Sequence, residues 1–187
     1  MKFIRIWLVQ LKNNWVREAV YRTNFLMTII VDLVWMLVEL ALFKVIYSNT
    51  PVLVGWTKEQ VYFFLGVFFA SDALFTTFFQ RNFWNFSDLV NKGDLDILLT
   101  KPVHPLFLAL TRWMNLTGIF NVCLGFAIMI NYSEAAGFAG GIHWIELGLW
   151  LILGMVTQML VRFAFSIWIF WTERSFALSR LYYQLFA

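Results

Sequence analysis

Long apolar segments separated by short polar connections dominate the pattern of this chain. About 20 consecutive apolar residues are enough for one helix to cross a bilayer. We therefore expect an all-α, polytopic transmembrane helix bundle that forms a single domain over residues 1–187. The four predicted spans are residues 25–47, 61–79, 106–130 and 144–171.

The two ends of the chain carry further helical patterns. In residues 3–20, Trp7, Leu11 and Trp15 recur at helical spacing among basic residues. This pattern favours an interfacial helix that lies on the membrane and binds anionic lipid headgroups. An ordinary soluble amphipathic helix is the alternative. Residues 172–187 resemble the start of a further helix, and the sequence stops before that helix could span.

Composition supports a membrane location. Hydrophobic residues make up 61% of the chain and charged residues 13%, whereas soluble domains carry about a quarter charged residues. The surplus apolar surface must face lipid. The single cysteine, Cys123, excludes an internal disulfide and is interpreted as a small buried hydrophobe.

The distribution of Lys and Arg predicts the orientation. Ten of these residues lie in the N-terminal segment, in the middle loop at residues 80–105 and in the C-terminal tail, against one in the other two connections. The positive-inside rule places the ten in the cytoplasm. We therefore expect a multi-pass protein of the cytoplasmic (inner) membrane with a cytoplasmic N-terminus. The net charge of +3 then reflects topology and not nucleic-acid binding.

The middle loop contains two predicted short helices. One is capped by Ser87 or Asp88 and ends near Gly93, and the second runs from Asp94 to Leu99, before the prolines Pro102 and Pro105. Their apolar residues suggest either a docking surface for a soluble partner or a loop that packs under its own bundle. Both interpretations stay open. The apolar residues concerned are Leu89, Val90, Leu95, Ile97, Leu98 and Leu99.

The run from Gly93 to Pro102 resembles the signature G-x-L-D-x-x-L-x-(K/R)-P of ABC type 2 permeases. These are membrane subunits of bacterial ATP-driven exporters, and the similarity is to a poorly characterised branch. Residues 21–25, 55–57 and 171–172 resemble the family's entry to the first span, start of the second and exit from the fourth. Family members usually have six spans, so the resemblance implies that the last spans are absent here.

The resemblance also implies a mechanism. In such exporters the middle loop forms a coupling helix that sits in a groove of a cytoplasmic nucleotide-binding ATPase subunit. The N-terminal helix would be the connecting helix at the membrane surface. Two permeases, as a homo- or heterodimer, would work with two ATPases, which would hold ATP and Mg, so this chain needs no cofactor of its own. The residues carried over as forming or bracing the contact are Asp88, Gly93, Asp94, Leu95, Asp96, Leu99, Lys101 and Pro102.

Ionisable residues within the spans form a second candidate site, because charges in lipid are costly and mark internal contacts or a pathway. These residues are Asp32, Glu39, Asp72, Arg112 and Arg162. At about 1.5 Å rise per residue, all but Glu39 fall in one layer roughly 9–14 Å deep. We expect structural pairing, for example of Asp32 with Arg162, with substrate contact as the alternative. Glu39, two turns above Asp32, is the better candidate for contact with a cationic or polar substrate.

Other features narrow the function. Gly118 and Gly125 predict a small face for close helix packing on the third span. His104 and His143 fall on opposite sides of the membrane, so no metal site is expected. No phosphate-binding glycine loop occurs, so ATP hydrolysis would belong to another polypeptide. We therefore expect a permease and not an enzyme. The alternatives are a substrate-binding membrane subunit of a vitamin-type importer, a membrane-embedded enzyme and a non-transporting membrane assembly protein.

Overall fold

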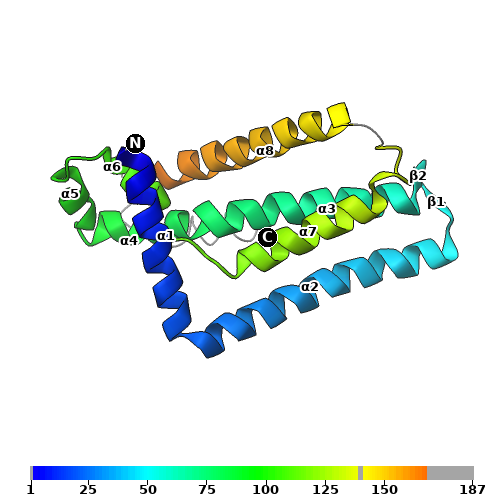
Figure 1. Cartoon of the computed structure of the whole chain (residues 1–187), viewed down its shortest axis with the longest axis horizontal. Coiled ribbons are helices and arrows are strands. Elements are labelled where there is room, and N and C mark those ends of the chain that lie inside the picture. The colour runs from blue at the N-terminus through cyan, green and yellow to red at the C-terminus, as the bar shows by residue number, and fades with distance from the viewer. Residues whose placement is uncertain (1, 139–140, 168–187) are drawn as a thin grey trace.

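A computed structural model of the chain describes residues 2–138 and 141–167. Four helices (α2, α3, α7 and α8) follow the long axis of the molecule, with short helices gathered at one end and a small hairpin at the other (Figure 1). In chain order the elements are α1 (Lys2–Val20), α2 (Arg22–Asn49), β1 (Val52–Leu53), β2 (Trp56–Thr57), α3 (Lys58–Phe75), the π-helical turn η1 (Thr76–Gln80), α4 (Arg81–Asn91), α5 (Asp94–Leu99), α6 (Pro105–Thr111), α7 (Gly118–Ser133) and α8 (Gly141–Ile167).

A short antiparallel hairpin connects α2 to α3 at the end of the molecule opposite α5 (Figure 1). The backbone N–H of Gln60 donates to the Thr57 hydroxyl at 3.4 Å, and the Gln60 side chain accepts from the Thr57 N–H at 3.0 Å. This reciprocal capping box satisfies two amide groups that would otherwise lack partners, which explains why α3 begins at Lys58.

Helices α3 and α7 form the most closely packed pair of the bundle. A Cβ atom added to Gly66 would lie 2.5 Å from the backbone N of Met129, and one added to Gly125 would lie 2.5 Å from that of Ala70. Gly118 lies against the side-chain hydroxyl of Thr77 in η1, which leaves no room for a Cβ atom there. The predicted close-packing face at Gly118 and Gly125 is therefore confirmed. Small residues let the two backbones touch, as in other membrane bundles.

The second predicted span, residues 61–79, lies within a longer helix. Residues 58–91 form one continuous helical stretch of 34 residues through α3, η1 and α4. The expected start of a loop at residue 80 is therefore wrong. Between residues 80 and 91 the sequence contains neither Gly nor Pro, and Phe83, Phe86 and Leu89 supply an apolar helical face that becomes buried. Nothing stops the helix before Gly93.

The third predicted span, residues 106–130, is not one helix. It consists of α6, a non-helical segment at residues 112–117, and α7, which has 16 residues. The reason is tertiary, because side chains from α1 and α4 take over the backbone hydrogen bonds of this segment, as described below. We call residues 112–117 the break segment.

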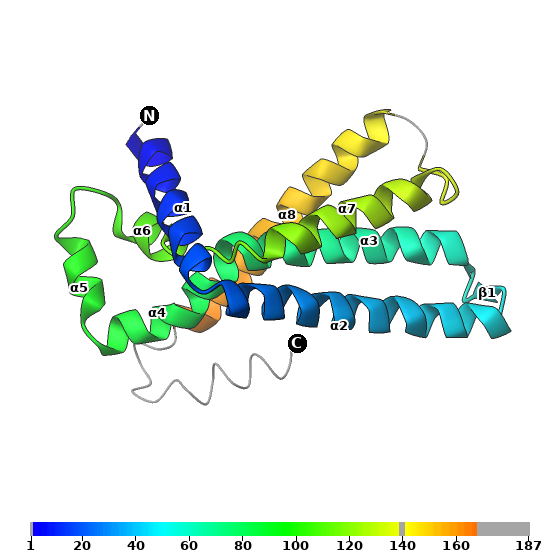
Figure 2. The same cartoon turned by 60° about the horizontal axis from the view of Figure 1, so that its bottom comes forward.

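Within the described residues, three helices are long and apolar enough to cross a membrane. They comprise residues 22–49, 58–91 and 143–167, and α7 is a shorter apolar helix. Large apolar side chains on α2 and α8 face outward, for example Trp35 and Trp150, which are 65% and 69% exposed. Figure 2 shows α8 leaning away from α3 and α7 toward the hairpin end. The fold is thus an all-α membrane helix bundle. The predicted helix at 172–187 and the end of the fourth span, residues 168–171, lie outside the described residues.

Candidate functional site

The turn between α4 and α5 depends on a left-handed glycine. Gly93 has φ +74°, a conformation that costs other residues roughly 1–2 kcal/mol. The N–H of Lys92 donates to the carbonyl of Asp88 at 3.0 Å, and the N–H of Gly93 donates to that of Val90 at 3.2 Å. The structure confirms the predicted helix from Asp94 to Leu99 as α5. It does not confirm a helix start near Asp88, which lies inside α4 and forms an exposed ion pair with Lys92 at 3.1 Å.

Helices α4, α5 and α6 fold back on one another around a cluster that we call the inner core. Helix α6 begins with Pro105 at a position where no N–H is needed, so the chain turns back toward the bundle there. Side chains of α1 and of the break segment also pack on this cluster. The buried members are Phe86, Leu89, Leu98, Leu108 and Ala109, and the partly buried ones are Ile6, Val90, Leu95, Val103, Phe107 and Trp113.

The inner core divides α5 into two faces. Leu98 is 2% exposed and Leu95 packs beside it, whereas Ile97 and Leu99 are each 58% exposed. Packing under the bundle therefore holds for Leu95 and Leu98, whereas docking of a partner stays a prediction for the exposed residues. One face packs under the bundle, and the other presents apolar side chains beside carboxylates. The remaining carried-over residues are also exposed, namely Asp94, Asp96, Lys101 and Pro102.

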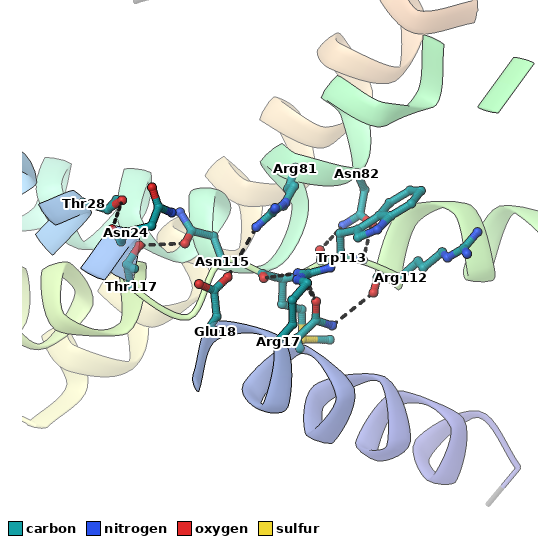
Figure 3. Close-up of polar contacts among 12 residues, drawn as sticks. Arg17, Glu18, Asn24, Thr28, Arg81, Asn82, Arg112, Trp113, Asn115 and Thr117 are labelled. Atoms are coloured by element: carbon teal, nitrogen blue, oxygen red, sulfur yellow. Dashed lines mark hydrogen bonds and ion pairs between the residues drawn. The ribbon is translucent and has the colours of Figure 1, made fainter. Parts of the chain in front are cut away.

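A second polar site lies where the break segment meets α4. Asn82 is fully buried, and its side-chain amide donates to the carbonyl of Trp113 at 2.7 Å and accepts from the N–H of Trp113 at 2.8 Å. The carbonyl of Thr77 in η1 accepts from the N–H of Asn115 at 2.8 Å. Figure 3 shows Asn82 against the backbone of Trp113. Side chains and a π-helical carbonyl thus replace the helical partners that the break segment lacks.

Helix α1 holds the same segment from its other side. Asn14, 3% exposed, donates to the carbonyl of Arg112 at 3.1 Å and accepts from the N–H of Met114 at 3.2 Å. Arg17 donates to the Asn14 side-chain oxygen. We call Asn14, Thr77 and Asn82, with the backbone groups that they bind, the inner junction.

Two charges of α1 lie beside the inner junction. Burial lowers the pKa of the Arg17 guanidinium, the nearby charge of Arg81 lowers it further, and Glu18 opposes both effects. Glu18 forms an ion pair with Arg81 at 3.4 Å, which ties α1 to α4 (Figure 3). The Glu18 side chain is only 11% exposed, so this pair is less screened by solvent than a surface pair.

The predicted position of Arg112 within a helical span is wrong. Arg112 follows the end of α6 at the start of the break segment, its side chain is exposed, and its guanidinium lies 4.9 Å from the centre of the Trp113 ring. Figure 3 shows the Arg112 side chain directed away from the inner junction. The balanced layer of two acids and two bases that the sequence suggests therefore does not form.

The other intramembrane residues lie on three different helices. Asp32 of α2 accepts a hydrogen bond from the side-chain amide of Asn121 on α7 at 2.9 Å. The guanidinium of Arg162 on α8 lies 4.3 Å from the centre of the Phe75 ring. Asp72 of α3 experiences the charges of both Arg162 and Asp32. Asp32 is thus bonded to Asn121, and its predicted pairing with Arg162 stays a prediction.

Glu39 lies on α2, two turns beyond Asp32, and is half-buried. Among the described residues no group of three or more His, Cys, Asp and Glu could hold a metal ion. Asn14 and Asn82 were not predicted from the sequence as functional residues. The available signal was an amide side chain in an otherwise apolar or basic helical pattern, which does not reveal the partner.

These features define the class of the protein, which is an all-helical, multi-span membrane protein. The family model for "ABC-2 family transporter protein" matches residues 33–187, and the chain belongs to this family. It is therefore a permease subunit of an ABC transporter and associates with an ATP-binding subunit. The chain has no match among curated proteins and none among solved structures.

Proposed function

We propose that this chain is the membrane-spanning permease of an exporter in the cytoplasmic membrane, and that α5 is its coupling helix. The observation that carries the proposal is the division of α5 into two faces. Its inner face is fixed in the inner core through Leu95 and Leu98, while Ile97 and Leu99 project outward. A helix that is rigidly held and apolar on its free side is suited to transmit a push from a docked subunit.

We call the exposed residues Asp94, Asp96, Ile97 and Leu99 the docking face. The basic N-terminus and the basic residues at 80–105 support a cytoplasmic position for it, with the N-terminus on the same side. ATP and Mg would bind only to the partner ATPase, two of which would serve two permeases. No nucleotide-binding loop occurs in this chain, which supports that division of labour.

The substrate would contact the spans and not α5. Asp32, Glu39 and Asp72 are acidic groups on α2 and α3, whereas Arg112 lies in the break segment beside α1. Relocation of Arg112 leaves the spans with more acid than base. This supports the prediction of a cationic or polar substrate group at Glu39, with Asp32 and Asp72 closer to a structural role.

Co-purification of the ATPase subunit tests the proposal. In the Ile97→Glu/Leu99→Glu variant, docking would bury two carboxylates without partners, at a cost of several kcal/mol or more. We expect retained ATPase to fall at least about tenfold while the thermal unfolding midpoint is unchanged, because neither residue belongs to the inner core. Val54→Glu is the matched control, since Val54 is 93% exposed in the hairpin at the opposite end. Full retention of ATPase by the double variant would reject α5 as the coupling helix.

A further inference from the structure

Two irregular backbone segments meet at the inner junction. The π-helical turn η1 lies within the continuous helical stretch of residues 58–91, and the break segment separates α6 from α7. Thr77 of η1 binds the backbone of Asn115, and Asn82, directly beyond η1, binds that of Trp113. π-Helical turns occur frequently at functional sites and are points where helical hydrogen bonding changes register. Because η1 and the break segment lie opposite each other, we treat the inner junction as one point at which the two halves of the chain can move relative to each other.

The parts on either side of the inner junction are each tightly packed. On one side, α3 and α7 touch backbone to backbone at Gly66 and Gly125, so they can move only as a pair. On the other side, the inner core holds α4, α5 and α6 together. A displacement of α5 can therefore reach α7 by two routes: through the inner junction, and through α4 and α3, which are joined by the buried cluster of Phe75, Phe83 and Leu110. The inner junction is the route that contacts the chain leading directly into α7.

The hydrogen bonds of the inner junction are expected to break together, because they are buried and share the same side chains. Asn82 is 0% exposed and Asn14 is 3% exposed, so neither can exchange its backbone partners for bulk water. Leaving one buried polar group without a partner is unfavourable, because the group has lost its hydrogen bonds to water and gained none in return. Asn82 holds both backbone groups of Trp113, and Asn14 holds the carbonyl of Arg112 and the N–H of Met114. Moving the break segment away from α4 or α1 would orphan several groups together.

We infer that Asn82 and Asn14 are positioning residues for transport, which clamp the break segment to α4 and α1 so that α7 follows the movement of α5. The inference rests on the proposed function, because the movement is the one that ATP-driven docking would impose. Without the hydrogen bonds of Asn82 and Asn14, the chain would bend at η1 and at the break segment. The inner core would then move relative to the α3–α7 pair, which would keep its position.

Two spin-label distances in the assembled permease–ATPase complex test the inference. In a Cys123→Ser background, one pair joins residue 91 at the end of α4 to residue 131 near the far end of α7. The other joins residue 49 at the end of α2 to residue 131. Both distances are measured without nucleotide and after trapping with MgATP and vanadate, with the labelled chain diluted into unlabelled chain.

The native complex should keep the 91–131 distance on trapping and change the 49–131 distance. Asn82→Leu and Asn14→Leu should each keep the nucleotide-free distances and the bound ATPase. On trapping, however, each variant should change the 91–131 distance and keep the 49–131 distance. Asn85→Leu is the control, because Asn85 lies on α4 outside the inner junction and should respond as the native chain does.

Each other outcome overturns a defined part of the account. A native response in both the Asn82 and Asn14 variants would show that the asparagines do not transmit movement. Loss of the nucleotide-free distances in both variants would show that they hold the fold and nothing more. A native complex that binds no ATPase, or whose 49–131 distance does not respond, would contradict the proposed function itself and remove the ground for the inference.

Discussion

Leu98 and Leu99 are adjacent in sequence and lie in opposite environments. Leu98 is 2% exposed within the inner core, and Leu99 is 58% exposed on the docking face. Successive residues on a helix point about 100° apart, so a helix that packs on one side separates neighbours in this way. Leu98 is therefore expected to stabilise the fold, and Leu99 to contribute to docking, within the same helix.

Alanine substitution at these two positions should have unequal effects on stability. Leu98→Ala removes buried methyl groups and leaves a cavity, which should lower the free energy of unfolding by about 2–5 kcal/mol. Leu99→Ala should change it by about 0.5 kcal/mol or less, because its side chain is exposed. Denaturation of the purified protein in one detergent, followed by circular dichroism, measures both. Equal losses for the two variants would contradict the described orientation of α5.

Residue-scale prediction from sequence succeeded where the cause is local. Gly93 could be placed at a helix end because a left-handed turn selects glycine, and it does have φ +74°. Asn14 and Asn82 could not be identified. Each also donates to the carbonyl four residues earlier on its own helix, but the break-segment partners in the hydrogen bonds to Arg112 and Trp113 lie 98 and 31 residues away, in a segment that the sequence pattern assigns to a helix. A polar side chain can be read from the sequence, but the distant backbone group to which it bonds cannot be predicted from it.

At the scale of elements, helix ends with a local signal were predicted and those set by packing were not. The bounds of α5 follow from Gly93 and the prolines after it, and they agree with the structure. The break segment contains neither Gly nor Pro, and its place depends on side chains contributed by α1 and α4. Similarly, α4 continues from α3 because the inner core buries its apolar face.

Helix α1 remains a predicted interfacial helix, and its depth is measurable. Its outward face combines Leu8 and Trp15, 52% and 61% exposed, with the exposed cation of Lys12. Such a face should lie roughly 5–10 Å into the boundary between headgroups and acyl chains. A spin label at residue 8 should show shallow immersion by oxygen and nickel-complex accessibility, and one at residue 35 in α2 should lie near the bilayer centre. A label at residue 8 that is fully water-accessible would contradict the interfacial assignment.

At the scale of the whole molecule, the short helices α4, α5 and α6 gather at one end of the long apolar helices. Figures 1 and 2 show α4, α5 and α6 together at one end and the β1–β2 hairpin at the other. The membrane bundle and its family were predictable from composition and from the Gly93–Pro102 run. The displacement of Arg112 was not, because depth counted along a sequence assumes an unbroken helix.

Site-directed photocrosslinking in native membranes tests the central claim most directly, that the ATPase docks on the outward face of α5. A photoreactive amino acid is placed at Ile97 and, as the control at the opposite end, at Val54, both of which are exposed. We predict a crosslink from residue 97 to the ATPase subunit and none from residue 54. Absence of the crosslink from residue 97, or its appearance from residue 54, would contradict the account.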